Sequence, residues 1–116
     1  MPFISKAGPD SRSGFREINR VTTDGTYTQL ALEDHVSYFT TATGSEDVHL
    51  PDVAEANGMV YSLYISSDGG QDIVPKTSYG LETPVAVGDT IVGIDGYLHV
   101  LSNGVDWIIL SNSAGT

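Results

Sequence analysis

Three histidines are the first residues of this sequence that could do chemistry, because imidazole binds zinc and carries protons near neutral pH. His35, His49 and His99 each fall in a stretch whose local pattern predicts a β-strand. No two of them stand at an HxH or HxxxH spacing, and no nearby carboxylate completes a ligand set. We therefore predict surface or interface histidines and no metal site. A histidine near a subunit contact would make assembly sensitive to pH.

The stretch Asp68-Gly69-Gly70-Gln71-Asp72 is the most calcium-like part of the sequence. Calcium takes about six to eight oxygen ligands, usually from several acidic side chains on one loop. Two aspartates around two glycines fall short of that number. A tight turn is the simpler interpretation, because glycines tolerate positive φ and Asp68 can bond its own backbone.

Paired carboxylates, Glu33/Asp34 and Glu46/Asp47, raise the question of glycoside hydrolysis. Both pairs fall in predicted turns, where solvated charge is the simpler interpretation. The sequence has no cysteine and no nucleophile-elbow motif, and its Gly69-Gly70 lacks the lysine of a phosphate-binding loop. We predict that the chain is not an enzyme and uses no cofactor.

Aromatic residues offer a different chemistry, the stacking of rings on a sugar or on another protein. The candidates are Tyr61, Tyr64, Tyr79, Tyr97 and Trp107. They could line a sugar-binding surface, or they could fill the core or a subunit interface. Since Trp107 stands between Asp106 and Ile108 in a terminal strand, we favour the core for this residue.

Charge divides the sequence into two parts. Four of its five basic residues, Lys6, Arg12, Arg16 and Arg20, lie in the first twenty positions, which carry about +2 once Asp10 and Glu17 are subtracted. The remaining residues, 21–116, carry about −12. An acidic body of this kind does not favour polyanions, and four basic residues do not make a basic face, so we expect no nucleic-acid partner.

The first seventeen residues are rich in Gly, Pro, Ser and charge, and they contain only three large apolar anchors, Phe3, Ile4 and Phe15. Such a composition predicts an extended arm that orders on binding. Its apolar run is too short for a signal peptide, and no stretch approaches the ~20 apolar residues of a membrane span. We expect no membrane partner.

The elements that must position these residues are short β segments separated by turns. Alternation predicts strands near 18–23, 26–32, 35–41, 59–66, 71–76, 90–94, 97–102 and 107–110. Asp24-Gly25 has the spacing of a two-residue hairpin, and Asp95-Gly96 and Asn103-Gly104 predict two further hairpin turns. Residues 52–57 are the one helical candidate, with Asp52 as its cap.

These elements predict one all-β domain at residues 18–110, an antiparallel β-sandwich or barrel-like fold with one short helix. The extended N-terminal arm at 1–17 precedes it, and residues 111–116 form a flexible tail. At 116 residues the chain is long enough to bury a core without a disulfide or metal.

One ordered set of short motifs is more specific than a general pattern of β-strands and turns. In order along the sequence they are Thr23-Asp24-Gly25-Thr26-Tyr27, Thr40-Thr41-Ala42-Thr43-Gly44, Val48-His49-Leu50-Pro51-Asp52, Glu55-Ala56-Asn57-Gly58, Tyr61 to Ile65, Ser67-Asp68-Gly69-Gly70, Gly88-Asp89-Thr90, Leu101-Ser102-Asn103-Gly104 and Trp107-Ile108-Ile109-Leu110. This order resembles a module of tailed-bacteriophage virions, found in head decoration (cement) proteins, head fibres and parts of tail fibres. The resemblance covers about residues 21–110.

The resemblance implies a β domain that assembles as a homotrimer and has a structural role in the virion. A short domain with one basic arm fits a decoration protein that binds the outer surface of the capsid and stabilises it. The alternative is a tail-fibre or head-fibre module that binds host-surface carbohydrate. For the first function the expected partner is the major capsid protein, and the expected capsid-binding residues are Phe3, Ile4, Lys6, Arg12, Phe15, Arg16 and Arg20.

Overall fold

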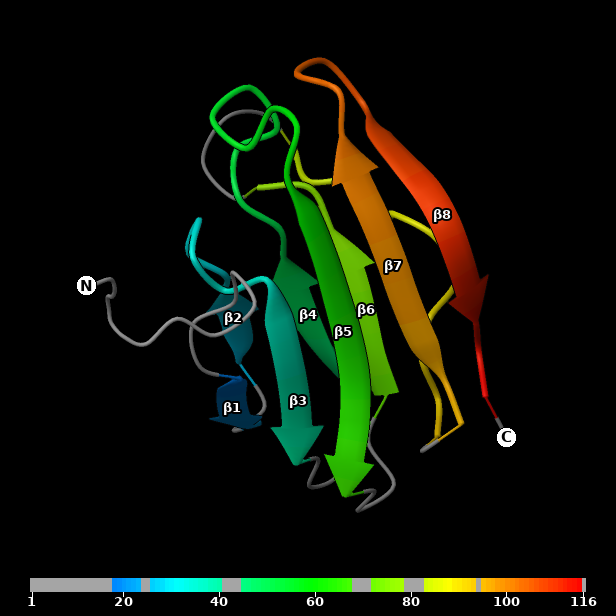
Figure 1. The fold of residues 1–116 in the computed structure, drawn as a ribbon. Coiled ribbons are helices and arrows are strands. Elements are labelled where there is room, and N and C mark those ends of the chain that lie inside the picture. Colours follow the sequence, from blue (N-terminus) through cyan, green and yellow to red (C-terminus); the bar gives the residue numbers. More distant parts are fainter. Residues whose placement is uncertain are drawn as a thin grey trace, which may run out of the picture.

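The computed structural model describes residues 18–23, 26–40, 45–67, 72–78, 83–93 and 95–115. In this part of the chain the backbone forms eight strands in two sheets and no helix. Sheet A, in front in Figure 1, has the order β1-β3-β5-β7-β8, and sheet B, behind it, has the order β2-β4-β6. The strands are β1 (Asn19–Thr22), β2 (Tyr27–Gln29), β3 (Val36–Thr40), β4 (Ser45–His49), β5 (Val60–Ser67), β6 (Asp72–Lys76), β7 (Tyr97–Ser102) and β8 (Trp107–Ser113). The prediction of an all-β chain is confirmed.

From β1 to β6 the chain alternates between the two sheets. It runs down sheet A and up sheet B in Figure 1, and each pass lies beside the previous one. The pairs β1–β3, β3–β5, β2–β4 and β4–β6 are therefore parallel. Each crossover from one sheet A strand to the next is right-handed, the sense that twisted strands favour. This part of the fold is a short two-sheet solenoid.

The last two strands end the solenoid with an antiparallel hairpin. β7 pairs with β5, and β8 pairs with β7 through the turn at Asn103-Gly104. Gly104 has a φ of +93°, and the Asn103 Oδ1 atom accepts the backbone N–H groups of Val105 and Asp106 at 2.9 and 2.7 Å. The sequence prediction for this hairpin is confirmed, because Asn-Gly encodes its turn locally.

The antiparallel prediction is wrong for four of the six strand pairs formed by the described residues. Residues 24–25 lie outside the described part, but the strands on either side of them, β1 and β2, belong to different sheets. The same holds for β5 and β6 on either side of residues 68–71. Alternation shows which side chains share a face, whereas the partner strand is set by packing between distant segments.

The short helix predicted at residues 52–57 is not formed; the structure has consecutive turns there. Asp52 acts as a cap in part, because its Oδ1 atom accepts the Ala54 N–H at 3.1 Å and its carbonyl accepts the Ala56 N–H at 2.9 Å. Gly58 follows with a φ of +84°, and its N–H donates a hydrogen bond to the Ser102 carbonyl. So short a segment gains too few helical hydrogen bonds to offset nucleation.

The core lies between the two sheets and follows the predicted alternation. Tyr61, Leu63 and Ile65 of β5 point inward and are buried, as is Phe39 of β3. Sheet B and its connections contribute Leu30, Val48, Leu50 and Ile73, and the hairpin contributes Leu98 and Val100. Full burial of each such side chain stabilises the fold by about 1.5–3 kcal/mol.

Residues 111–113, which sequence analysis placed in a tail, are part of sheet A. β8 continues to Ser113, and the Ala114 carbonyl accepts the Val92 N–H at 2.7 Å. Residues 83–93 run along the far side of β6, where isolated antiparallel bridges join Ile73 to Ile91 and Lys76 to Ala86. This irregular segment lies opposite β8 and completes the second layer at that edge.

Candidate functional site

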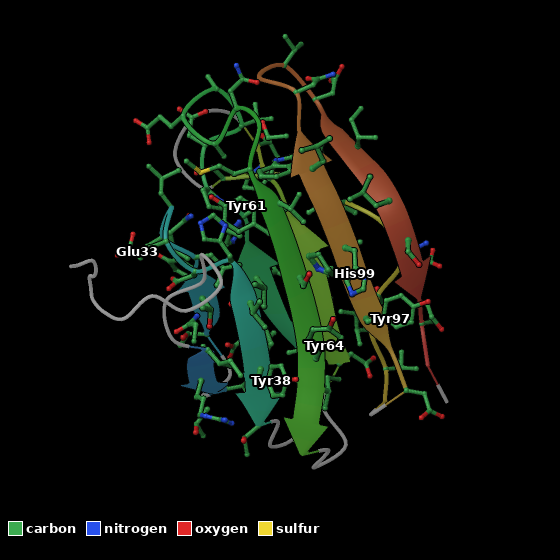
Figure 2. All side chains as sticks on the ribbon, viewed as in Figure 1. Glu33, Tyr38, Tyr61, Tyr64, Tyr97 and His99 are labelled. Carbon is green, nitrogen blue, oxygen red and sulfur yellow. The ribbon has the colours of Figure 1, made fainter. Side chains whose placement is uncertain are left out.

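The outer face of sheet A carries aromatic side chains that align across its strands. Strand register places Arg20 beside Tyr38, Tyr38 beside Tyr64, and Tyr64 beside Tyr97. His99 lies two residues along β7 from Tyr97. Figure 2 shows Tyr38, Tyr64, His99 and Tyr97 following one another across β3, β5 and β7. We call Arg20, Tyr38, Tyr64, Tyr97 and His99 the aromatic row.

Ring contacts run along the whole row. The ring centroids are 5.2 Å apart for Tyr38–Tyr64, 5.5 Å for Tyr64–His99 and 5.0 Å for Tyr97–His99. The Arg20 guanidinium carbon lies 5.7 Å from the centre of the Tyr38 ring, which is within the range of a cation–π contact. Each of the three tyrosines is half-buried, so part of its side chain remains accessible.

Such a row presents flat apolar rings together with hydroxyl and imidazole groups. Rings of this kind contribute large contact area at low cost in conformational entropy, and they bind sugar rings or another protein surface. The Tyr97 hydroxyl accepts a hydrogen bond from the Ser111 hydroxyl at 3.2 Å, which steadies the end of the row next to β8. The row is therefore suited to binding another ring or an apolar surface.

A second feature of the same face is apolar. Val60, Leu101 and Ile108 stand opposite one another on β5, β7 and β8. Val60 and Ile108 are each 41% exposed, and Leu110, at the irregularity in β8, is 53% exposed. We call Val60, Leu101 and Ile108, together with the exposed Leu110 two positions further along β8, the apolar strip. It ends at β8, the edge strand of sheet A.

The histidines are not arranged for metal binding. The Nδ1 atom of His35 lies 3.0 Å from the Val60 carbonyl, and that of His49 lies 2.9 Å from the Thr77 carbonyl. His49 is only 3% exposed, so the expectation of a surface or interface position is wrong for this residue; its hydrogen bond offsets the burial. Among the described residues no cluster of three His, Cys, Asp or Glu could hold a metal ion.

The paired carboxylates also have structural roles. Glu46 lies within β4 and is 1% exposed, so the prediction of a solvated turn residue is wrong. The Thr28 hydroxyl donates to its Oε2 atom at 2.7 Å. Asp47 lies 3.1 Å from the Lys76 ammonium group, and the Asp34 carboxylate accepts the Ala31 N–H at 2.8 Å.

Tyr61 has a clearly shifted pKa. Burial, together with the nearby Asp34 and Glu33 carboxylates, raises the pKa of its phenol from 10.0 to about 12. Its hydroxyl donates to the Leu32 carbonyl at 2.8 Å. A phenol that is neutral throughout the physiological range serves as a hydrogen-bond donor in the core.

Of the residues predicted to bind the capsid, Phe3, Ile4, Lys6, Arg12, Phe15 and Arg16 lie outside the described residues. Arg20 lies in β1 at one end of the aromatic row. Of the aromatic candidates, Tyr64 and Tyr97 lie in the row, Tyr61 lies in the core, and Tyr79 is outside the described part. Trp107 packs against the core, as favoured from the sequence.

The alignment of Arg20, Tyr38, Tyr64 and Tyr97 could not be found from the sequence, since it depends on the register of strands that are distant along the chain, two pairs of them parallel and one antiparallel. In the part of the chain that the structure describes, no helix is long and apolar enough to cross a bilayer. Searches of known protein families, curated proteins and solved structures find no match to this chain. A functional proposal therefore draws on the sequence resemblance and on the arrangement of these side chains.

Proposed function

We propose that this chain is a structural protein of a bacteriophage virion, a trimeric capsid decoration protein that binds the outer surface of the head and stabilises it. Its β-sandwich-like body packs against other copies, and residues 1–17 with Arg20 contact the major capsid protein. The proposal rests on the family resemblance and on the acidic, all-β body. The structural observation that supports it best is the exposed apolar strip.

The strip supports self-association for a physical reason. Ile108 and Leu110 are more than 40% exposed on an edge strand whose outer side has no partner strand among the described residues. An exposed apolar edge strand favours pairing with another chain, and proteins that stay monomeric usually block such edges with charge or proline. Residues 107–113 contain neither. A subunit contact along β8 would bury the strip.

Multivalency explains how such a protein would bind stably to the capsid although each arm binds weakly. Ordering an arm costs roughly 1–2 kcal/mol per residue, while burial of one apolar anchor returns about 1.5–3 kcal/mol. A single arm with Phe3, Ile4 and Phe15 as anchors therefore binds weakly. Three arms on one trimer raise the effective concentration of the second and third, so occupancy depends on assembly.

The test separates assembly from attachment. The intact chain, a variant that lacks residues 1–17 and the variant Ile108→Asp are each sedimented with phage heads and sized by light scattering. We expect the truncated chain to remain a trimer that does not sediment with heads, and Ile108→Asp to lose both properties. Attachment by the truncated chain, or a monomeric intact chain at micromolar concentration, would contradict the proposal.

A second function is favoured by the aromatic row. A head-fibre or tail-fibre module that binds host-surface carbohydrate would use Tyr38, Tyr64 and Tyr97 as a stacking surface. A glycan array on the intact chain tests this, with Tyr97→Ala as the variant expected to lose signal. Tyr27→Ala, an exposed tyrosine of sheet B, is the matched control. Saturable binding lost only in Tyr97→Ala would favour the fibre function over head decoration.

A further inference from the structure

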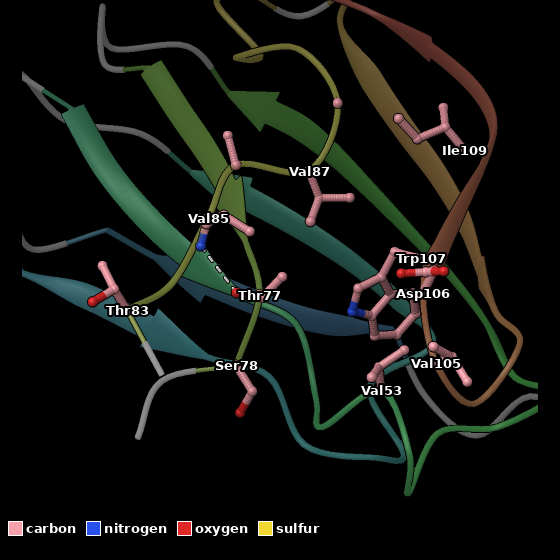
Figure 3. Close-up of a pocket in the computed structure, with 12 residues that line it drawn as sticks. Val53, Thr77, Ser78, Thr83, Val85, Val87, Val105, Asp106, Trp107 and Ile109 are labelled. Atoms are coloured by element: carbon pink, nitrogen blue, oxygen red, sulfur yellow. Dashed lines mark hydrogen bonds between the residues drawn. The ribbon is translucent and has the colours of Figure 1, made fainter. Parts of the chain in front are cut away.

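A pocket of about 440 Å³ opens between β8 and the irregular segment that completes sheet B. Its apolar wall consists of Val53, Val85, Val87, Trp107 and Ile109, which Figure 3 shows around one hollow. Thr77 fixes the opposite wall, because its N–H donates to the Val85 carbonyl at 2.9 Å and its hydroxyl accepts the Val85 N–H at 3.0 Å. This volume is typical of ligand pockets, which span roughly 300–1,000 Å³.

Trp107 gives the pocket a polar group with no hydrogen-bond partner in the described part of the chain. The Nε1 atom of its indole is buried and makes no hydrogen bond with any described residue. Figure 3 shows this nitrogen on the side of the ring that faces Thr77 across the hollow. The ring is held in place by an edge contact with Tyr61, at 5.6 Å between centroids. A buried N–H without an acceptor costs about 1–3 kcal/mol, so an occupant that supplies an oxygen would bind more tightly.

We propose that this pocket binds the side chain of Phe3 or Ile4 from a second copy of the chain, with a backbone carbonyl of that segment accepting the Trp107 N–H. The inference rests on the self-association in the proposed function and names one of its contacts. With Phe3 and Ile4 bound to a neighbouring subunit, the contact with the shell is made by Arg12, Phe15, Arg16 and Arg20. The apolar strip along β8 is the other subunit contact, and it keeps a chain without residues 1–17 in the trimer.

The chemistry of the two partners is complementary. Phe3 and Ile4 form the one adjacent pair of large apolar residues before Ile18, and Lys6 is the nearest charge to them. Asp106 lines the pocket beside Trp107, where its carboxylate can meet that ammonium group. The body's strongly negative charge also favours a basic segment over an acidic one.

The position of the pocket favours a second copy. Residues 1–17 precede β1 at one edge of sheet A, and the pocket lies beside β8 at the other edge. When copies stand edge to edge, the β1 edge of one is next to the β8 edge of its neighbour. A head-to-tail contact of this kind closes into a ring when the rotation between copies allows it, and three copies make the smallest such ring.

The test uses Trp107, which is the only tryptophan of the chain and so reports on the pocket through its fluorescence. A synthetic peptide of residues 1–8 is titrated into the dilute intact chain. We expect a saturable change in Trp107 emission. A peptide in which both Phe3 and Ile4 are alanine should give no change, and one with Lys6→Ala should bind several-fold more weakly. Equal responses to all three peptides would overturn the proposal.

A variant of the pocket wall tests whether the change in Trp107 emission comes from binding in the pocket. Val85→Asp places a charge in the pocket wall, and because Val85 is 60% exposed the variant should fold. It should lose the response, whereas Tyr27→Asp, on the other sheet, should keep it. If Trp107 emission stays constant both when the peptide is added and when the protein concentration is changed, while the intact chain still forms trimers, this inference fails and the proposed function stands. If the peptide binds but the chain stays monomeric, the proposed function fails, and with it the role of a second copy.

Discussion

The Tyr64 hydroxyl lies 2.8 Å from the Nε2 atom of His99, across the antiparallel pair β5–β7. The two residues are not directly opposite, since register pairs Tyr64 with Tyr97 and His99 with Ser62. The contact is therefore diagonal, and it joins the Tyr38–Tyr64 rings of the solenoid to the Tyr97–His99 rings of the hairpin. One hydrogen bond thus makes the aromatic row continuous across two parts of the fold.

Two substitutions at Tyr64 should have different costs. Tyr64→Phe keeps the ring and loses the hydrogen bond, so we expect about 0.5–1 kcal/mol of lost stability. Tyr64→Ala also removes the ring contacts to Tyr38 and His99, and we expect a loss of about 1–3 kcal/mol. Urea unfolding measures both. Equal costs for the two variants would show that the rings contribute nothing beyond the hydrogen bond.

The buried Glu46 carboxylate makes Thr28 a sensitive position. Thr28→Val preserves shape but removes the hydroxyl that donates to Glu46 at 2.7 Å. Removal of the donor from a buried carboxyl group costs about 1–3 kcal/mol, and we expect a loss of that size. Thr22→Val, at an exposed position of β1, is the control and should change stability by less than about 0.5 kcal/mol. A cost at Thr28 no larger than at Thr22 would mean that Glu46 is satisfied without this donor.

The sequence predicted the positions of strands better than their partners. The alternation at Tyr61, Leu63 and Ile65 located β5 and its buried face, and Asn103-Gly104 located a hairpin, because both signals are local. The parallel pairing of β3 with β5 is not local, since it joins Tyr38 to a residue 26 positions later. For this reason the aromatic row and the buried position of Glu46 were not predicted.

Alkaline pH should destabilise the protein through Tyr61. The pKa of its phenol is raised from 10.0 to about 12 in the folded state, chiefly by burial and then by Asp34 and Glu33. Because this value is above that of the unfolded chain, the contribution is complete below pH 10 and is lost as the pH rises through about 12. Urea midpoints at pH 9 to 12 should fall more steeply for the native chain than for Tyr61→Phe. If the urea midpoints of the two proteins fall equally between pH 9 and 12, the raised pKa of Tyr61 is not the cause of the alkaline destabilisation.

Two glycines with positive φ form a matched pair for testing the hairpin turn. An alanine at Gly58 would meet nothing within 4 Å, whereas at Gly104 its Cβ would lie 3.0 Å from the Asn57 side chain. Both substitutions carry the backbone strain of a positive φ, about 1 kcal/mol or more. We expect Gly104→Ala to cost more than Gly58→Ala by thermal unfolding. The reverse order would indicate that Asn57 moves aside freely.

Assembly along β8 gives the sharpest prediction for function. Ile108→Asp places a charge in the middle of the apolar strip, on a side chain that is 41% exposed in the single chain. Since the side chain is already partly in water, the cost to folding should be small, about 1 kcal/mol. Burying an unpaired carboxylate at a subunit contact costs several kcal/mol, so the oligomer should dissociate at concentrations where the native chain is assembled.

The control for this variant is Tyr27→Asp, which adds the same charge at a 50% exposed position of sheet B. Light scattering across a dilution series measures the mass of each protein, and circular dichroism confirms that both are folded. If the strip is a subunit contact, Ile108→Asp alone becomes monomeric. If both variants dissociate, net charge rather than position controls assembly. If neither dissociates, the copies meet elsewhere, and the aromatic row becomes the next surface to test.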